Sequence, residues 1–301
     1  MDKAVRGKAR GSWILALAQG LFLRSTGRPF SPAERSGMLA LGTATLFLGN
    51  GTPLFAALAL VFFVLACMGA PFFPGWSFFY RVFSHGRRDR PQISLSFDDG
   101  PDPLTTPALL TLLQRYGFCA TFFVNGKKAR QYPFLVEAIL AQGHELGNHS
   151  YSHEACIMFR SPARILREMM LTQRVLARHG VAPALFRPPV GIHVPAYAEA
   201  LYQSGLQAVN FSCRGRDLGN RRVAGLAVRI LKKLRPGDIV LLHDVAPKKG
   251  EKDEREFLRL WQHELEHIFV AICARNLEVV PLGQLCSCRA MERVQKEEIR
   301  R

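Results

Sequence analysis

The chain lacks charged side chains altogether between Gly37 and Tyr80, where no Asp, Glu, Lys or Arg occurs. Acidic residues are scarce as well, because 24 Asp and Glu stand against 40 Lys and Arg and leave a formal net charge of +16. The seven cysteines lack the paired spacing of a zinc knuckle or of a secreted disulfide framework, so we expect most of them to be reduced core residues. The long uncharged run is typical of a membrane segment.

Basic residues are concentrated beside this uncharged run. Residues 1–90 hold eleven Lys or Arg against three acids. Basic flanks next to apolar segments are typical of contact with anionic lipid on the cytoplasmic side. No nucleic-acid-binding motif occurs, so we expect membrane lipid, and no nucleic acid, among the partners. Within residues 1–36 an apolar patch over 13–23 is too short to span, and no small-residue cleavage site follows it, which favours a basic, partly interfacial segment over a signal peptide.

The hydrophobic region over residues 37–80 has two apolar limbs, 38–48 and 54–70, separated by the turn-forming residues 49–53. It predicts either a transmembrane hairpin or a single span near 54–73, and the third possibility is a buried hairpin of a soluble protein. Arginines follow the uncharged run, just as basic residues precede it. This distribution favours the hairpin, with both ends of the run and the catalytic domain on the cytoplasmic side. We expect the protein in a membrane, the inner membrane of a bacterium.

From residue 91 onward, short β-rich runs alternate with longer helical patterns. Seven runs have strand character: 93–97, 120–124, 145–148, 185–187, 207–212, 239–243 and 277–281. Helical patterns between them cover 106–116, 162–179, 222–234 and 254–274. Crossover helices of this length join parallel strands, so the pattern predicts an α/β fold, either a (β/α) barrel of about seven strands or a doubly wound sheet. We expect a catalytic domain over 91–285 and a charged C-terminal tail over 286–301.

Polar side chains stand at the carboxyl ends of these predicted strands, where functional residues of such folds gather. The adjacent carboxylates Asp98 and Asp99 close the first strand, and His149 and His153 follow the third at an i, i+4 spacing. That spacing lets both imidazoles face one ion, so a carboxylate and two histidines predict a metal site. Three further residues end or follow later strands: Arg187, Asp217 and His243.

Five segments in this order resemble the motifs of the polysaccharide deacetylase family, carbohydrate esterase family 4, over about residues 91–285. They are residues 96–101 (SFDDGP), 149–153 (HSYSH), 187–191 (RPPVG), 216–217 (RD) and 241–243 (LLH). The resemblance implies a distorted (β/α) barrel with a divalent metal, most often zinc, that removes N-acetyl or O-acetyl groups from sugars. It also implies that Asp98 is the general base and that Asp99, His149 and His153 hold the metal.

The resemblance implies roles for further residues as well. His243 would protonate the leaving amine, and the backbone N–H of Val190 would stabilise the oxyanion. Arg187 beside Asp98 would keep that carboxylate ionised, and Asp217 beside His243 would raise the pKa of the imidazole. Leu241 of the fifth motif would contact the substrate.

The chain departs from the family pattern at several positions around the expected sugar site. The family commonly has Tyr at Val190 and an aromatic residue at Leu218, so aliphatic walls replace aromatic surfaces on which a sugar ring could stack. Arg214 stands where many members place an acid. With its neighbours it suggests a phosphate-bearing or lipid-linked glycan, the basic residues being Arg214, Arg216, Arg221 and Arg222.

The sequence thus predicts a membrane-anchored, metal-dependent hydrolase that removes N-acetyl or O-acetyl groups from a sugar of a cell-envelope or lipid-linked glycan. A deformylase or other amide hydrolase acting on a lipid-linked amino sugar is the nearest rival within the same chemistry. Two rivals come from different classes of protein. One is a catalytically silent carbohydrate-binding membrane protein. The second is a membrane scaffold in which the barrel has a packing role and no catalytic activity.

Overall fold

The computed structural model describes residues 28–73, 75–247 and 253–294. The chain forms two compact units: one comprises the residues up to Pro71 together with Ser77–Tyr80, and the other comprises Phe72–Trp76 and the residues from Arg81 onward. Of the segment predicted as interfacial, residues 1–36, the first 27 residues lie outside the described part of the chain.

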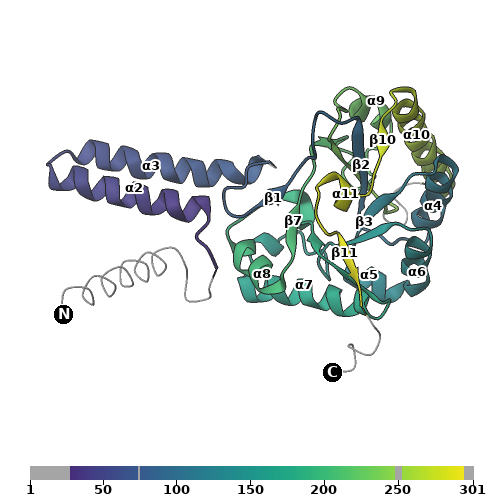
Figure 1. Cartoon of the computed structure of the whole chain (residues 1–301), viewed down its shortest axis with the longest axis horizontal. Coiled ribbons are helices and arrows are strands. Elements are labelled where there is room, and N and C mark those ends of the chain that lie inside the picture. The colour runs from purple at the N-terminus through teal and green to yellow at the C-terminus, as the bar shows by residue number, and fades with distance from the viewer. Residues whose placement is uncertain (1–27, 74, 248–252, 295–301) are drawn as a thin grey trace, which may run out of the picture. The chain divides into compact units, whose positions relative to one another are not determined.

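The first unit is a helical hairpin of α2 (Pro32–Gly49) and α3 (Pro53–Gly69), which lie side by side in Figure 1. A capping box starts α2, because the Ser31 hydroxyl accepts from the Glu34 N–H and the Glu34 carboxylate accepts from the Ser31 N–H. The helix therefore begins inside the segment predicted as interfacial. A single 3-10 turn, η1 (Ala70–Phe72), follows α3.

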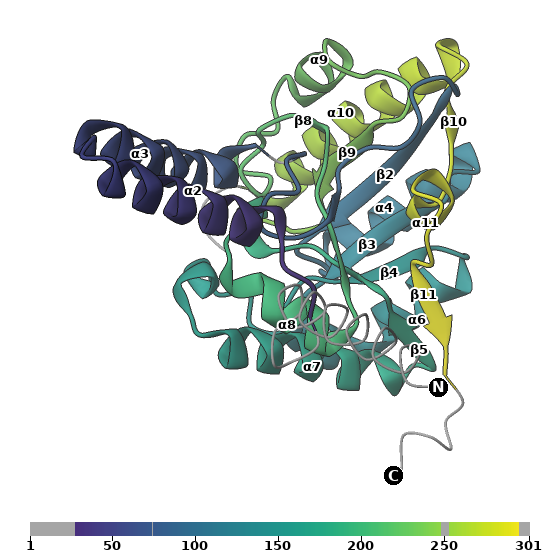
Figure 2. The same cartoon turned by 60° about the vertical axis from the view of Figure 1, so that its left-hand side comes forward.

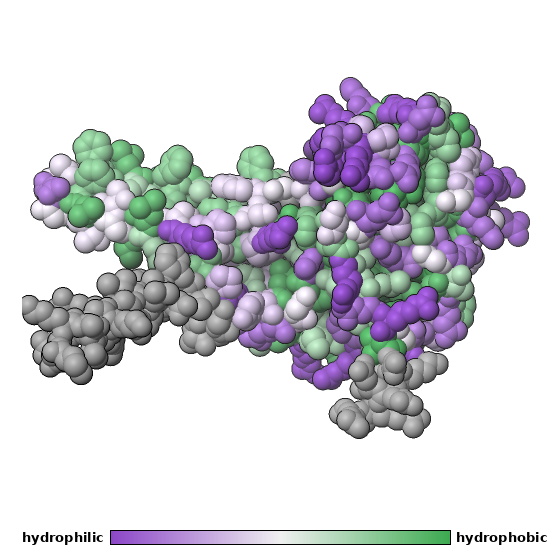
Figure 3. Space-filling view, in the orientation of Figure 1, coloured by the Kyte–Doolittle hydropathy of each residue, from purple (hydrophilic) through white to green (hydrophobic). Residues whose placement is uncertain are grey.

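The hairpin leaves most of its apolar surface uncovered. Figure 3 shows green and near-white side chains along it, and Ala56 is the only residue of α3 that is buried. Among the described residues one helix, Pro53–Phe72, is long and apolar enough to cross a membrane by length and composition. The two limbs thus form a helical hairpin, and only the second limb meets the criteria for a spanning helix. Helix α2 carries Glu34 and Arg35 in its first turn.

The second unit is built on a parallel sheet, which confirms the α/β prediction. All seven predicted strands form: β2 (Gln92–Asp98), β3 (Ala120–Val124), β4 (Glu145–Asn148), β6 (Leu185–Phe186), β7 (Gln207–Val209), β9 (Ile239–His243) and β10 (Glu278–Val279). Two short strands, β1 (Val82–Phe83) and β8 (Cys213–Arg214), extend it. Eight strands run in the order β1-β7-β6-β4-β3-β2-β9-β8, and β10 pairs with β2. The strands curve into a distorted, incompletely closed barrel (Figure 2).

Helices surround this sheet on its outer side (Figures 1 and 2). They are α4 (Thr105–Tyr116), α5 (Gly126–Gln131), α6 (Pro133–Ala141), α7 (Pro162–Ala177), α8 (Ala196–Ser204), α9 (Leu226–Leu231) and α10 (Glu254–Ala274). The short helix α11 (Leu282–Leu285) lies on the inner side, where Leu282 and Leu285 pack with Phe123 and Leu241. The helix predicted over 222–234 is shorter than expected. It starts only after Gly225, which has φ +70°, and the Glu264 carboxylate caps it by accepting from the N–H groups of Gly225 and Ala227.

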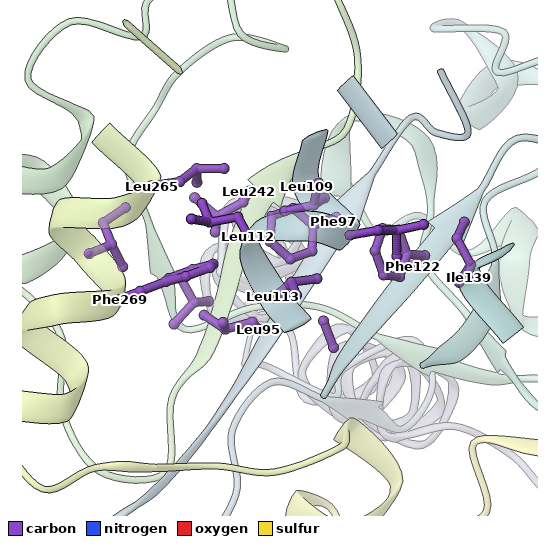
Figure 4. Packing of buried hydrophobic residues seen from close by; sticks show 14 of the residues in the cluster. Leu95, Phe97, Leu109, Leu112, Leu113, Phe122, Ile139, Leu242, Leu265 and Phe269 are labelled. Carbon is purple, nitrogen blue, oxygen red and sulfur yellow. The ribbon is translucent and has the colours of Figure 1, made fainter. Parts of the chain in front are cut away.

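The main core lies between the sheet and the outer helices. Leu95 and Phe97 of β2 pack with side chains of α4 and α10, as Figure 4 shows. Because successive side chains of a strand point to opposite faces, Ser96 and Asp98 are directed to the inner side of the barrel. The same alternation in β9 places Leu241 and His243 on the inner side. The alternation that buries the core residues of β2 and β9 therefore also brings Asp98 and His243 to the same side of the sheet.

The structure differs from the sequence-based boundaries at the C-terminal end. Residues 286–301 are predicted to be a charged tail, but Met291–Arg293 forms β11 and pairs antiparallel with β5 (Val181–Pro183). Ala290, which precedes β11, is buried among hydrophobic residues on the inner side of the sheet. The folded domain therefore extends at least to Arg293. A three-residue strand rich in charged side chains gives too weak a periodic signal to be predicted from sequence.

Candidate active site

Asp99, His149 and His153 come together, as the sequence predicts. One potential ligand atom from each lies within 4.8 Å of the others. Asp99 Oδ1 is 2.9 Å from Nε2 of His153 and 3.4 Å from Nε2 of His149. Asp99 follows β2 with φ +72°, and the turn after β4 holds His153 at φ +52°. These left-handed conformations are costly for residues other than glycine, and they turn Asp99 and His153 toward His149.

The donor set fits a metal ion. Nδ1 of His149 lies 2.7 Å from the carbonyl oxygen of Arg187, which only accepts hydrogen bonds, so Nδ1 carries the proton. In the neutral ring, Nε2 then presents a lone pair to the Asp99 carboxylate, and a cation between them removes the repulsion. Burial disfavours ionisation of Asp99, but the neighbouring imidazoles of His149 and His153 hold the pKa of its carboxyl well below the usual range.

Asp98 lies directly beside this group and is paired with Arg187. The Arg187 guanidinium donates to Asp98 Oδ1 at 2.6 Å and to the Ser96 hydroxyl at 2.8 Å. Asp98 is 5 % exposed and Arg187 is fully buried. Removing one partner of such a buried pair typically costs on the order of 3–5 kcal/mol, because the other charge is left without compensation. The predicted contact between Arg187 and Asp98 is therefore present.

Sequence reasoning missed the residues that hold Arg187 in place. Its guanidinium lies 4.0 Å from the ring centroid of Phe123 and donates to the carbonyl oxygen of Asn210 at 3.0 Å. Burial lowers the pKa of Arg187, and the charge of Asp98 opposes that effect. Alternation along β2 and β3 was a usable signal, because it places Ser96 and Phe123 on the inner side with Asp98.

His243 and Asp217 form the second predicted pair. Nδ1 of His243 donates to Asp217 Oδ2 at 2.8 Å. Burial favours the neutral ring, but the negative charge of Asp217 and this hydrogen bond outweigh it and raise the pKa of His243 to about 9. The imidazole is therefore protonated near neutral pH and can donate a proton from Nε2.

Other residues that sequence reasoning missed hold the surrounding loops. The Asn220 amide donates to the carbonyl oxygens of His243 and Val245, both at 2.9 Å. The Lys128 ammonium donates to the carbonyl oxygen of Asp99 at 2.8 Å. No motif spacing points to these contacts, because each joins segments that are distant in the sequence.

The site opens into a cleft of about 720 Å³. Its walls include Val190, Leu218 and Leu241, the three residues predicted to bind substrate. Val190 and Leu218 are 56 % and 67 % exposed, and both have positive φ. Arg187 lies below the wall and does not line the cleft. Of the four predicted basic residues, Arg214, Arg216 and Arg221 line it, whereas Arg222 does not.

A parallel (β/α) barrel with a carboxylate and two imidazoles at its strand ends, flanked by an Asp–Arg and a His–Asp pair, defines a hydrolase of the metal-dependent kind. The chain belongs to the polysaccharide deacetylase family. The model of that family, described as polysaccharide deacetylase, matches residues 85–209. The predicted family is thereby confirmed; the match covers the first three of the five motifs, and residues 216–217 and 241–243 lie beyond it.

Similar proteins support this assignment. A peptidoglycan-N-acetylglucosamine deacetylase of Bacillus cereus is 36 % identical over 154 residues, which cover 50 % of this chain and 72 % of that protein. A chitooligosaccharide deacetylase of a Bradyrhizobium species is 33 % identical over 197 residues, 64 % of this chain and 90 % of the relative. The crystal structure of the Bc1960 peptidoglycan N-acetylglucosamine deacetylase matches with a TM-score of 0.62 and 25 % identity, over 72 % of this chain and 97 % of that one.

Proposed function

We propose that this protein is a membrane-anchored, metal-dependent deacetylase that removes the N-acetyl group from an amino sugar of a cell-envelope glycan. One observation carries the proposal. The possible metal ligands Asp99, His149 and His153 share a cleft with two further groups, Asp98 paired with Arg187 and the protonated His243 paired with Asp217. Environments that set a base and an acid apart in one site are typical of acid–base catalysis.

The metal is proposed to be zinc, held by one carboxylate oxygen of Asp99 and by Nε2 of His149 and His153. Three protein ligands of this type are common in catalytic zinc sites, which keep a further position open. When bound, such an ion polarises the acyl carbonyl and lowers the pKa of water toward about 7. The carbonyl of Arg187 orients the ring of His149 through Nδ1.

Asp98 is proposed to accept the proton of the attacking water. The Arg187 guanidinium donates to Oδ1 and leaves Oδ2 for that proton. Asp98 Oδ2 is 3.9 Å from Nε2 of His149, so the base lies next to the proposed ligands. The hydrogen bond from Arg187 also fixes the direction of the carboxylate.

His243 is proposed to give its proton to the leaving amine, because Asp217 keeps the imidazole charged at neutral pH. The backbone N–H of Val190 is proposed to donate to the oxyanion. One donor of this kind typically contributes about 3 to 4 kcal/mol to transition-state stabilisation. Val190 has φ +64°, a strained conformation for a β-branched residue, and this fits a backbone that is held for a function.

Substrate and location follow from the walls of the cleft and from α3. Val190, Leu218 and Leu241 offer aliphatic contact to the sugar or to its acyl group. The uncovered apolar surface of α3 would place the enzyme in a membrane, proposed to be a bacterial inner membrane with the catalytic domain on the cytoplasmic face. A glycan carried on membrane lipid would then be a substrate in reach.

Acid release from defined sugars tests the proposal. The full-length zinc-loaded protein should release acetate from N-acetylated chitooligosaccharides or peptidoglycan fragments, and Asp98→Asn should lower kcat at least 100-fold. The matched control is Asp89→Asn, since Asp89 is exposed and pairs with Arg87 on the surface. Formate release from an N-formylated sugar with no acetate release would identify a deformylase instead. Unchanged release by Asp98→Asn would contradict the assigned base.

A further inference from the structure

Three arginine side chains line the cleft that holds the proposed catalytic residues: Arg214, Arg216 and Arg221. All three come from the segment between β7 and α9, next to the strand that carries His243. A concentration of guanidinium groups in one wall gives that wall a positive potential, which attracts and orients anions.

The register of the sheet places Arg214 near the reacting end of the cleft. Arg214 of β8 pairs with Leu241 of β9, two residues before His243. Neighbouring residues of paired parallel strands point to the same face, so Arg214 lies on the inner face with Leu241 and His243. Two residues correspond to about 7 Å along the strand. The Arg214 guanidinium lies 5.2 Å from the ring centroid of Phe211, another residue of the cleft wall, which holds it against that wall.

Arg216 is tied to the active site through its neighbour. Asp217 is fixed by its hydrogen bond to His243, and Arg216 precedes it with φ +52°. This left-handed conformation is unusual for a long side chain. It turns the backbone so that Asp217 is buried against His243 while Arg216 is exposed in the cleft.

The described acids of the cleft are paired with groups other than Arg214 and Arg216. Asp98 is paired with Arg187, Asp217 with His243, and Asp99 with the two histidines. In the part of the chain that the structure describes, no carboxylate lies within ion-pair distance of Arg214 or Arg216. Two guanidinium groups in a cleft, with no counter-ion among the described residues, are suited to an anion that arrives with the substrate.

We propose that Arg214 and Arg216, with Arg221 beside them, form a subsite for a phosphate or diphosphate ester carried by the N-acetylated sugar. This inference rests on the proposed function, because it names the substrate class of the same site. Guanidinium groups bind phosphate oxygens in a bidentate manner, and a neutral oligosaccharide offers them no such partner. The exposed aliphatic side chains of Val190 and Leu218 border the subsite and suit the apolar chain of a lipid-linked sugar.

The test compares neutral and phosphate-bearing forms of N-acetylglucosamine. The full-length protein is given N-acetylglucosamine oligomers without phosphate, the same sugar as a polyprenyl diphosphate, and the same sugar as a nucleotide diphosphate. We expect kcat/KM for the phosphate-bearing sugars to exceed that for the neutral sugar at least tenfold. The preference should fall at least tenfold in the Arg214→Gln, Arg216→Gln double variant. Arg222→Gln is the control, because Arg222 does not line the cleft.

A binding arm separates failure of the subsite from failure of the proposed function. Calorimetry on the Asp98→Asn variant measures the affinity for the phosphate-bearing and the neutral sugar without turnover. Tighter binding of the phosphate-bearing sugar, lost with the two arginines, supports the subsite even if nothing is hydrolysed, and only the proposed function then falls. Equal affinity, or a preference that survives in the double variant, overturns the subsite while leaving the deacetylase intact. A preference for the lipid over the nucleotide form identifies the source of the phosphate.

Discussion

At the scale of single residues, one backbone dihedral separates the roles of two adjacent carboxylates. Asp98 is the last residue of β2 and follows its alternation, so its side chain reaches Arg187 inside the barrel. Asp99 has φ +72° and leaves the strand toward His149 and His153. The two acids are adjacent in the sequence. They reach different partners because β2 ends at Asp98 and the backbone turns at Asp99.

Asp217→Asn tests the proton donor through its pH dependence. The pKa of His243 is about 9, so the protonated ring that donates is present below about pH 9 and is lost as the pH rises through that value. Replacing Asp217 removes the negative charge that raises this pKa, so the alkaline limb of kcat/KM should move to lower pH. The measurement is the pH profile of acid release, with Asp89→Asn as the variant that keeps the wild-type limb. An unmoved limb in Asp217→Asn would assign that limb to another group.

At the scale of elements, Gly147 of β4 affects Arg187 indirectly, through the ring of Phe123. A Cβ added to Gly147 would lie 2.4 Å from Cδ1 of Phe123, whose fully buried ring contacts the Arg187 guanidinium. We therefore expect Gly147→Ala to lower the free energy of unfolding by about 1–3 kcal/mol and to reduce kcat as Asp98 loses its fixed partner.

The companion variant is Phe123→Leu in the Gly147→Ala background, which makes room for the added methyl group. Denaturant unfolding should show that the double variant recovers part of the stability lost in Gly147→Ala, since contacting residues are energetically coupled. Additive losses would show that the two side chains do not compete for the same space.

Helix α3 supports a prediction about location. Phe62 is 78 % exposed near the middle of α3, and a charge there disfavours insertion into a bilayer by about 2.5–3.5 kcal/mol. We expect Phe62→Arg to reduce the membrane-bound fraction of the full chain, measured by fractionation without detergent. Val228→Arg on α9 is the control, because Val228 is 70 % exposed on the barrel unit. Wild-type protein found entirely in the supernatant would contradict membrane anchoring.

At the scale of the whole molecule, the sequence predicts strand ends better than it predicts the contacts that support them. Asp98 and His243 could be predicted because each closes a buried apolar run, and His149 because it stands four residues before His153. The position of Phe123 under Arg187, the hydrogen bonds of Asn220 and the pairing of β11 with β5 join segments far apart in the chain. They depend on how the strands curve into a barrel, which no local pattern encodes.

The three-dimensional arrangement also decides which basic residues line the cleft. Arg214, Arg216, Arg221 and Arg222 look equivalent in the sequence, yet only the first three line the cleft. Alternation in β8 and the left-handed backbone at Arg216 decide which of these side chains face the site.

Acetate release before chelation, after chelation and after return of zinc tests the proposed metal-dependent mechanism most directly. If Asp99, His149 and His153 bind one catalytic ion, release should be lost in the chelated protein and restored by one equivalent of zinc per chain. His153→Gln should retain little zinc and release little acetate under the same conditions. Release of acetate that continues at the full rate in the metal-free protein would contradict this mechanism.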